Sequence, residues 1–159
     1  MAATVVNRQR GVAVSPSRLA QAAARALAAV GRPVSDLDIL VVDDAEMRRM
    51  NRRFLGADAS TDVLAFPLEV PRAGGDLLGQ VVISADTARR QARQLGVAVA
   101  LEMALLVTHA VLHLVGYDDR DPAEARLMHL RERQILEVSA RLSPRLWNGL
   151  LEGASSPVA

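Results

Sequence analysis

Two histidines four residues apart, His109 and His113, have the spacing of metal ligands. On a helix this spacing places both imidazoles on one face, one turn apart, where they can bind one ion. Gly116 follows three residues later, and glycine tolerates the left-handed conformation that ends many helices. The turn could therefore return Asp119 towards the histidines as a third ligand. A histidine pair alone can equally be a hydrogen-bonded core pair; the glycine and the aspartate favour the metal site.

The full pattern, H-x-x-x-H-x-x-G-x-x-D, is the metzincin layout with two changes. The final ligand is Asp119 rather than histidine, and Ala110 stands where a zinc peptidase carries its general-base glutamate. A metal site without that glutamate argues against peptide hydrolysis. Three protein ligands leave a fourth position for water, whose pKa a divalent cation lowers towards neutrality. The motif therefore predicts hydrolytic chemistry without identifying the substrate.

The motif resembles the signature of a known family, the YbeY endoribonucleases, which are bacterial rRNA-maturation factors. The family signature is H-G-x-L-H-L-x-G-Y-D-H followed by E-x-x-x-M-x-x-x-E. This chain matches it at His109, Leu112, His113, Leu114, Gly116, Tyr117, Asp118, Glu124, Met128 and Glu132. A second block, L-N-x-x-Y-R-x-x-D-x-x-T-D-V-L-S-F-P, is matched at Asn51, Phe54, Asp58, Thr61, Asp62, Val63, Leu64, Phe66 and Pro67. A third, L-G-D-I-V-I-S, is matched at Leu78, Gly79, Val82, Ile83 and Ser84. The blocks occur in family order, and a chance match of all three would be rare.

The resemblance implies a metal-dependent endoribonuclease, specific for single-stranded RNA, that acts in maturation of small-subunit (16S) ribosomal RNA and in ribosome quality control. It implies one Zn²⁺ ion held by His109, His113 and Asp119, with Mn²⁺ or Mg²⁺ as alternatives because a carboxylate suits harder ions. The implied partners are the precursor of small-subunit rRNA and the small ribosomal subunit, with an assembly GTPase as a further candidate. Two other classes stay open. One is a ribosome-assembly factor that binds RNA or protein on the same fold with weak or no catalysis, and the other is an unrelated hydrolase of small molecules.

Three more residues join the metal ligands as catalytic candidates. Thr61 and Asp62 stand where the family lines its cleft, although the same pair could simply cap the junction of a loop and a strand. Asp118 could support a histidine from outside the ligand shell, or it could be a surface carboxylate of the turn. We predict that the two histidines project from one helix face into a cleft walled by residues 61–66.

The chain also departs from the family pattern. Leu55 stands where the family has its functional arginine, and the other departures are Asp119 for histidine, Ala65 for serine and Gln80 for aspartate. Leucine cannot donate to a phosphate, and losing one charge-stabilising donor can cost roughly 100- to 1,000-fold in rate. We therefore expect slow RNA cleavage. Arg52 and Arg53 are nearby, but residues three or two positions earlier on a helix point elsewhere.

Composition narrows the choice of partners and compartment. The formal net charge of +1 provides no global attraction to nucleic acid, although four arginines cluster within residues 48–53 and could contact RNA backbone or form a solvated face. The absence of cysteine excludes disulfides and leaves histidine and carboxylate as metal ligands. Residues 95–116 are apolar, but Glu102 and the two histidines make a membrane span costly. We expect a cytoplasmic protein without a membrane segment.

The 159 residues predict one domain over residues 1–152, with a disordered tail at 153–159. The fold class is α+β: a small mixed four-stranded β-sheet backed by about five helices, with a zincin-like central metal-binding helix. Expected strands include residues 5–6 and 12–14 as the first, then 37–42, 62–66 and 78–84, with an exposed connection over residues 67–75. Expected helices run from Pro16 to Val30, from Asp43 to about Leu55, from Ala85 to Leu95, over about residues 97–115 and from Pro122 to about Arg141. In the last of these, Leu127, Met128 and Leu130 are expected to pack inward.

Overall fold

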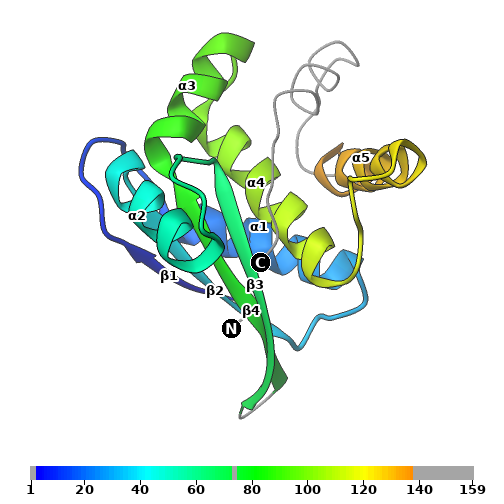
Figure 1. Cartoon of the computed structure of the whole chain (residues 1–159). Coiled ribbons are helices and arrows are strands. Elements are labelled where there is room, and N and C mark those ends of the chain that lie inside the picture. The colour runs from blue at the N-terminus through cyan, green and yellow to red at the C-terminus, as the bar shows by residue number, and fades with distance from the viewer. Residues whose placement is uncertain (1–2, 73–74, 138–159) are drawn as a thin grey trace.

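The computed structural model describes residues 3–72 and 75–137. They form a four-stranded mixed sheet and five helices, as the sequence predicts (Figure 1). Strands β1 (Ala3–Asn7), β2 (Asp36–Val42), β4 (Gly75–Ser84) and β3 (Val63–Arg72) lie in that order. The β1–β2 and β2–β4 pairs are parallel, and β3–β4 is an antiparallel hairpin. Strand β3 is therefore an edge strand.

The helices cover the sheet unequally. Helices α1 (Pro16–Ala29) and α4 (Val99–Leu114) pack against each other and against one face of the sheet, as Figure 1 shows. Helix α2 (Asp44–Leu55) lies on the other face, where it contacts β4. Helix α3 (Ala85–Leu95) packs against α4, and α5 (Pro122–Glu137) packs against α4 and α1. Helix α4 is thus the central helix, in contact with strands on one side and helices on the other.

Local signals explain where the helices begin and end. The side chains of Ser15, Asp43 and Ser84 each accept a hydrogen bond from a backbone N–H in the first turn of α1, α2 and α3. Asp121 does the same at α5, accepting from the Glu124 N–H at 3.3 Å. Gly56 ends α2 with a left-handed φ of 73°. These ends could be read from sequence because each depends on neighbouring residues alone.

The strand predictions need two corrections. Residues 12–14 do not extend the first strand; instead the Gln9 side chain bonds both the N–H and the C=O of Val12 at 2.9 Å and closes a turn. The expected exposed connection over residues 67–75 is largely a continuation of the hairpin, whose register shifts between Pro67 and Val70. Proline is tolerated there because an edge strand leaves one row of N–H groups unpaired. Glu69, with φ 50°, lies in the irregular segment.

In α5, Met128 is fully buried, but Leu127 and Leu130 are 62% and 53% exposed, so the prediction that all three pack inward is wrong for the two leucines. One face of α5 meets α4, and Met128 packs there with Leu112 and Ile135. The predicted continuation to Arg141 and the predicted tail at 153–159 lie outside the described residues.

A close approach fixes α4 on the hairpin. A Cβ atom at Gly79 would lie 2.6 Å from the Phe66 carbonyl oxygen and 2.9 Å from Leu114 Cδ2. Glycine at this position in β4 therefore allows the last turn of α4, which carries His113, to sit directly on β3 and β4.

No single helix in the described ranges is long and apolar enough to cross a membrane. Helices α3 and α4 meet the length and composition test only as a pair, and they are bent by 115° at their junction.

Candidate metal centre

Helix α4 brings His109 and His113 together. Both side chains are buried, and their Nε2 atoms lie 3.0 Å apart. The rings meet edge to face, with centroids 4.6 Å apart and planes at 81°. The helix has no side-chain cap at Ala98, and burial of eleven of its residues holds it in place instead. The two rings share one environment, as the four-residue spacing predicts.

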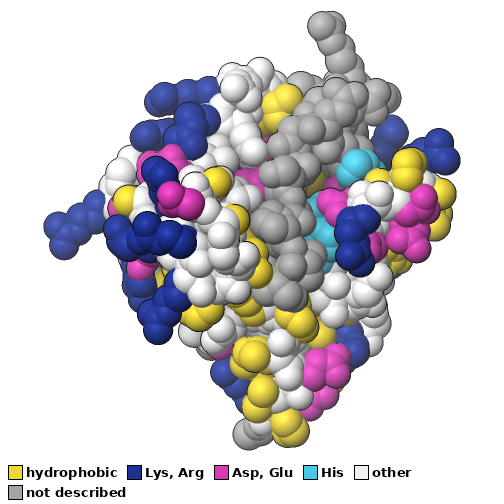
Figure 2. All heavy atoms as spheres, viewed as in Figure 1, with side chains coloured by type: hydrophobic (Ala, Val, Ile, Leu, Met, Phe, Trp, Pro, Cys, Tyr) yellow, Lys and Arg dark blue, Asp and Glu magenta, His cyan; other side chains and the backbone are white. Residues whose placement is uncertain are grey.

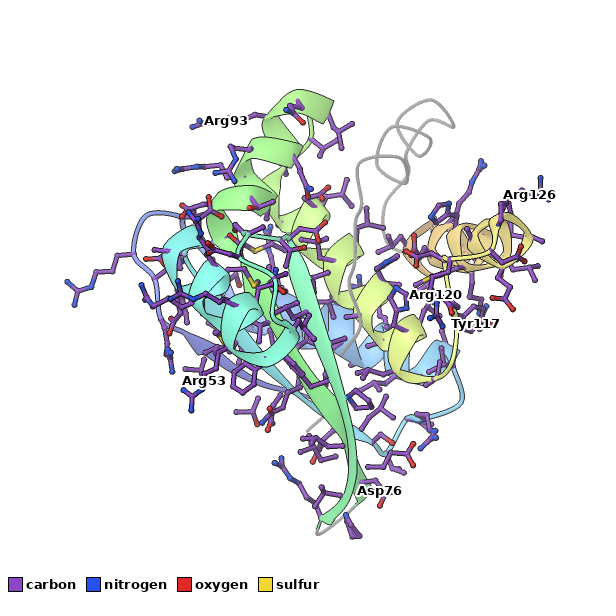
Figure 3. The ribbon with its side chains drawn as sticks, viewed as in Figure 1. Arg53, Asp76, Arg93, Tyr117, Arg120 and Arg126 are labelled. Atoms are coloured by element: carbon purple, nitrogen blue, oxygen red, sulfur yellow. The ribbon has the colours of Figure 1, made fainter. Side chains whose placement is uncertain are left out.

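The turn after α4 returns Asp119 to the histidines. Helix α4 ends at Leu114, Gly116 takes a φ of 106°, and the N–H of Tyr117 donates to the Leu112 carbonyl at 3.0 Å. Figure 3 shows Tyr117 and Arg120 on this loop between α4 and α5. Asp119 Oδ2 then lies 3.8 Å from the Nε2 atoms of both histidines. The predicted chain reversal therefore occurs, and it brings the three predicted ligands together.

The outer nitrogen of each ring is occupied by an acceptor. His113 Nδ1 lies 3.0 Å from the Tyr117 carbonyl oxygen, which can only accept, so this nitrogen carries the hydrogen. His109 Nδ1 contacts Oε1 of Glu132, a fully buried carboxylate on α5. When each hydrogen sits on Nδ1, the neutral rings direct their Nε2 lone pairs into the shared space.

These three donors fit a small divalent cation. Two imidazole nitrogens and a carboxylate oxygen form a donor set that zinc accepts, and ligand atoms in a tetrahedral zinc site lie about 3.3 Å apart. The observed separations of 3.0 and 3.8 Å bracket that value. His109, His113 and Asp119 are a group whose donor atoms all lie within 4.8 Å of one another, as a metal site requires. A single proton shared between the two Nε2 atoms would give a partner to the histidines only. A cation would be bound by both Nε2 atoms and by the Asp119 carboxylate.

Burial keeps His113 ready to bind a cation. Burial, and then the neighbouring His109, lower the pKa of His113 below its usual value, although Asp119 and the Tyr117 carbonyl act in the opposite direction. The neutral ring is the form that ligates metals. The environment therefore favours the ligand form of His113 at neutral pH.

Of the other catalytic candidates, Asp118 lies on the loop that carries Asp119, and Thr61 and Asp62 lie directly before β3. Asp62 is buried, and its carboxylate accepts from the Val63 N–H at 2.8 Å and from Gln91 Nε2 at 3.4 Å. Thr61 is half-buried beside it. Asp118 accepts from the backbone N–H of Arg120 at 3.0 Å and from its Nε at 2.8 Å, and this arginine lowers the Asp118 pKa to about 2. The described contacts of Asp118 are thus those of a turn carboxylate, although its charge also favours protonated His113.

Two buried acids, Glu132 and Glu102, were not predicted from the sequence to be buried or to lie near the site. Glu132 touches His109, and Glu102 lies on α4, two turns before His109, where Asp62 raises its pKa further than burial alone. A signal for Glu132 was available, because Met128 and Glu132 are four residues apart and so share the face of α5 that packs on α4. For Glu102 the signal was its place inside the apolar stretch of residues 95–116, although that stretch does not reveal the approach of Asp62.

The basic residues of α2 are partly neutralised. Arg48 pairs with Asp58 at 2.9 Å, and Arg52 lies 4.0 Å from the same carboxylate. Arg53 stacks over the Phe54 ring at 5.4 Å from its centroid. Figure 2 shows arginines gathered over the α2–α3 side.

Leu55 is half-buried against an apolar cluster of Val42, Met47, Leu64 and Val82.

The fold and the site define an α+β protein with a histidine–histidine–carboxylate group of the kind that hydrolytic metalloenzymes use. The family model described as endoribonuclease YbeY matches residues 4–140. An endoribonuclease YbeY of Anaeromyxobacter sp. (strain Fw109-5) is 46% identical over 132 residues, covering 83% of this chain and 69% of the relative. One of Geobacter metallireducens is 38% identical over 146 residues, covering 89% and 97%. The chain belongs to the endoribonuclease YbeY family.

A solved structure agrees on the fold. The solution structure of TM1509 from Thermotoga maritima superposes with a TM-score of 0.60 at 21% identity, covering 92% of this chain and 89% of that one. At this identity the likeness concerns the fold alone.

Proposed function

We propose that this chain is a metal-dependent endoribonuclease that cleaves single-stranded RNA and acts, in the cytoplasm, on the precursor of small-subunit ribosomal RNA and in ribosome quality control. The observation that carries the proposal is the convergence of His109, His113 and Asp119 in a member of the endoribonuclease YbeY family. The small ribosomal subunit and an assembly GTPase are the partners that this role implies.

In this proposal the two histidines and Asp119 would hold one ion, Zn²⁺ first, with Mn²⁺ and Mg²⁺ as alternatives. Such an ion polarises a phosphoryl oxygen and lowers the pKa of a water molecule. The chain itself places the donors: α4 orients both rings, and the Gly116 turn carries the carboxylate. Ala110 supplies no base, so proton transfer must use other groups, for which Thr61, Asp62 and Asp118 are the candidates.

The direct test is cleavage of one labelled RNA in single-stranded and duplex form. We expect the purified chain to cut the single strand, a chelator to stop the cutting, and added Zn²⁺ or Mn²⁺ to restore it. A His113→Ala variant, which lacks one donor, is the negative control for a contaminating nuclease. Cleavage that persists in chelator or in this variant would contradict the proposal.

A second candidate function is a ribosome-assembly factor that binds RNA or protein on the same fold with weak or no catalysis. The observation that favours it is Leu55, which lies in an apolar cluster where the family has an arginine. RNA binding without cleavage in any of the three metals would support this candidate over the nuclease.

An arginine at position 55, where the family pattern has one, should raise the rate of RNA cleavage. We expect Leu55→Arg to increase metal-dependent cleavage by about 100-fold or more, since one donor aimed at the phosphate is worth roughly 100- to 1,000-fold. The variant also loses part of the contact with the cluster around Met47, at a cost of roughly 1 kcal/mol of stability. Single-turnover rates of parent, Leu55→Arg and the uncharged control Leu55→Gln on one RNA provide the comparison. Equal rates for the arginine and glutamine variants would count against the argument.

A further inference from the structure

Glu132 is a carboxylate buried in the interface between α5 and α4, next to His109. Its side chain is fully buried, and Oε1 contacts His109 Nδ1, while no described residue hydrogen-bonds the buried Oε2. Taking a carboxylate out of water costs several kcal/mol unless its partners compensate. A buried acid with His109 as its described partner therefore calls for a reason beyond packing.

Packing alone does not require this acid. Helix α5 already docks on α4 through the apolar contact of Met128 and Ile135 with Leu112. These side chains lie within one turn of Glu132, before and after it. An apolar residue at position 132 would extend that contact, so the carboxylate is not needed to hold the two helices together.

The two histidines are held by different acceptors. His113 Nδ1 faces a neutral backbone carbonyl, which belongs to the turn that also carries Asp119. His109 Nδ1 faces a carboxyl group on a separate helix. A carboxylate in this position fixes the ring's orientation and tautomer and makes the opposite nitrogen a stronger donor.

We propose that Glu132 is a positioning residue of the metal centre: by accepting the Nδ1 hydrogen of His109, it keeps the Nε2 lone pair directed at the cation and increases cation affinity. This rests on the metal-binding part of the proposed function but not on RNA cleavage. The role parallels that predicted for Asp118, whose described hydrogen bonds go to Arg120 instead.

The test measures Zn²⁺ alone, by competition with a chromophoric chelator, in the full chain. Glu132→Gln keeps the shape and the acceptor oxygen but removes the charge, and Glu132→Leu removes the acceptor. We expect Zn²⁺ affinity to fall about 10-fold in the first variant and about 100-fold in the second, the range typical of partners outside the ligand shell. Glu124→Gln, on the same helix but exposed, is the matched control and should bind as the parent does.

A second readout separates positioning from structural support. In the metal-free protein, ¹⁵N chemical shifts should show His109 protonated at Nδ1 in the parent and shifted towards the Nε2-protonated tautomer in Glu132→Leu. A purely structural residue would change the Tm of the metal-free protein without changing the extra Tm gained on adding Zn²⁺. If Glu132→Leu does not fold, the isosteric Glu132→Gln decides alone.

The outcomes separate this inference from the proposed function. Unchanged Zn²⁺ affinity and an unchanged His109 tautomer in a folded variant would overturn the inference, even if the parent cuts RNA. A parent that binds Zn²⁺ through a Glu132-dependent site but cuts no RNA would overturn the nuclease and leave the inference standing. A parent that binds no divalent cation would overturn both.

Discussion

Replacing Asp119 with alanine is expected to abolish stoichiometric Zn²⁺ binding. Asp119 Oδ2 is the third donor of the group and lies 3.8 Å from both histidine Nε2 atoms, and the histidines alone leave two positions to water. Zn²⁺ affinity should fall by more than the roughly 10- to 100-fold that is lost when a residue outside the ligand shell is removed. Asp119→His should preserve or tighten binding, because it supplies a nitrogen donor from the same turn.

Metal content after gel filtration, together with chelator competition, measures this effect. The control is Glu124→Gln, which removes an exposed acid near the same loop and should leave binding unchanged. Zn²⁺ affinity in Asp119→Ala equal to that of the parent would show that Asp119 only shapes the turn.

The type of the third ligand also affects which metal is preferred. The carboxylate of the parent should bind Mn²⁺ more readily, relative to Zn²⁺, than the histidine of Asp119→His does.

The parts of this molecule that follow from the sequence are those set by neighbours along the chain. The ends of α2 follow from an Asp43 cap and a left-handed Gly56. The convergence of His109, His113 and Asp119 follows from helical spacing and one glycine turn, all within eleven residues. Each of these features needs no knowledge of what packs against it.

The structural features that the sequence does not predict depend on contacts between residues that are far apart along the chain. The hairpin continues past Pro67 because β3 lies at the sheet edge, which is a property of the strand order and not of the segment. Glu132 reaches His109 across 23 residues, and only the packing of α5 on α4 brings them together. The apolar neighbours of Glu102 in the sequence indicate that it is buried, but its approach to Asp62 depends on how α4 packs against the sheet.

Glu102 leads to the second large prediction, which concerns stability and pH. Its side chain is 1% exposed, Oε2 has no hydrogen-bond partner among the described residues, and burial together with Asp62 raises its pKa from 4.5 to about 8. The folded protein therefore holds a proton that the unfolded chain releases above about pH 4.5. The resulting stabilisation is complete below that pH, declines as the pH rises, and is lost once the pH passes the folded pKa of about 8.

We therefore expect Glu102→Gln, which stays neutral at every pH, to remove this decline. Relative to the variant, the parent should lose on the order of 5 kcal/mol of unfolding free energy between pH 4.5 and pH 8, at no more than about 1.4 kcal/mol per pH unit for one proton. Urea denaturation of both proteins from pH 5 to pH 9 measures the difference, with exposed Glu124→Gln as the matched control. Because the amide resembles the protonated acid in shape, the two proteins should be similar near pH 5, and the variant should be clearly more stable at pH 8. Parallel curves across this range would show that Glu102 is ionised in the folded protein and that another group compensates its charge.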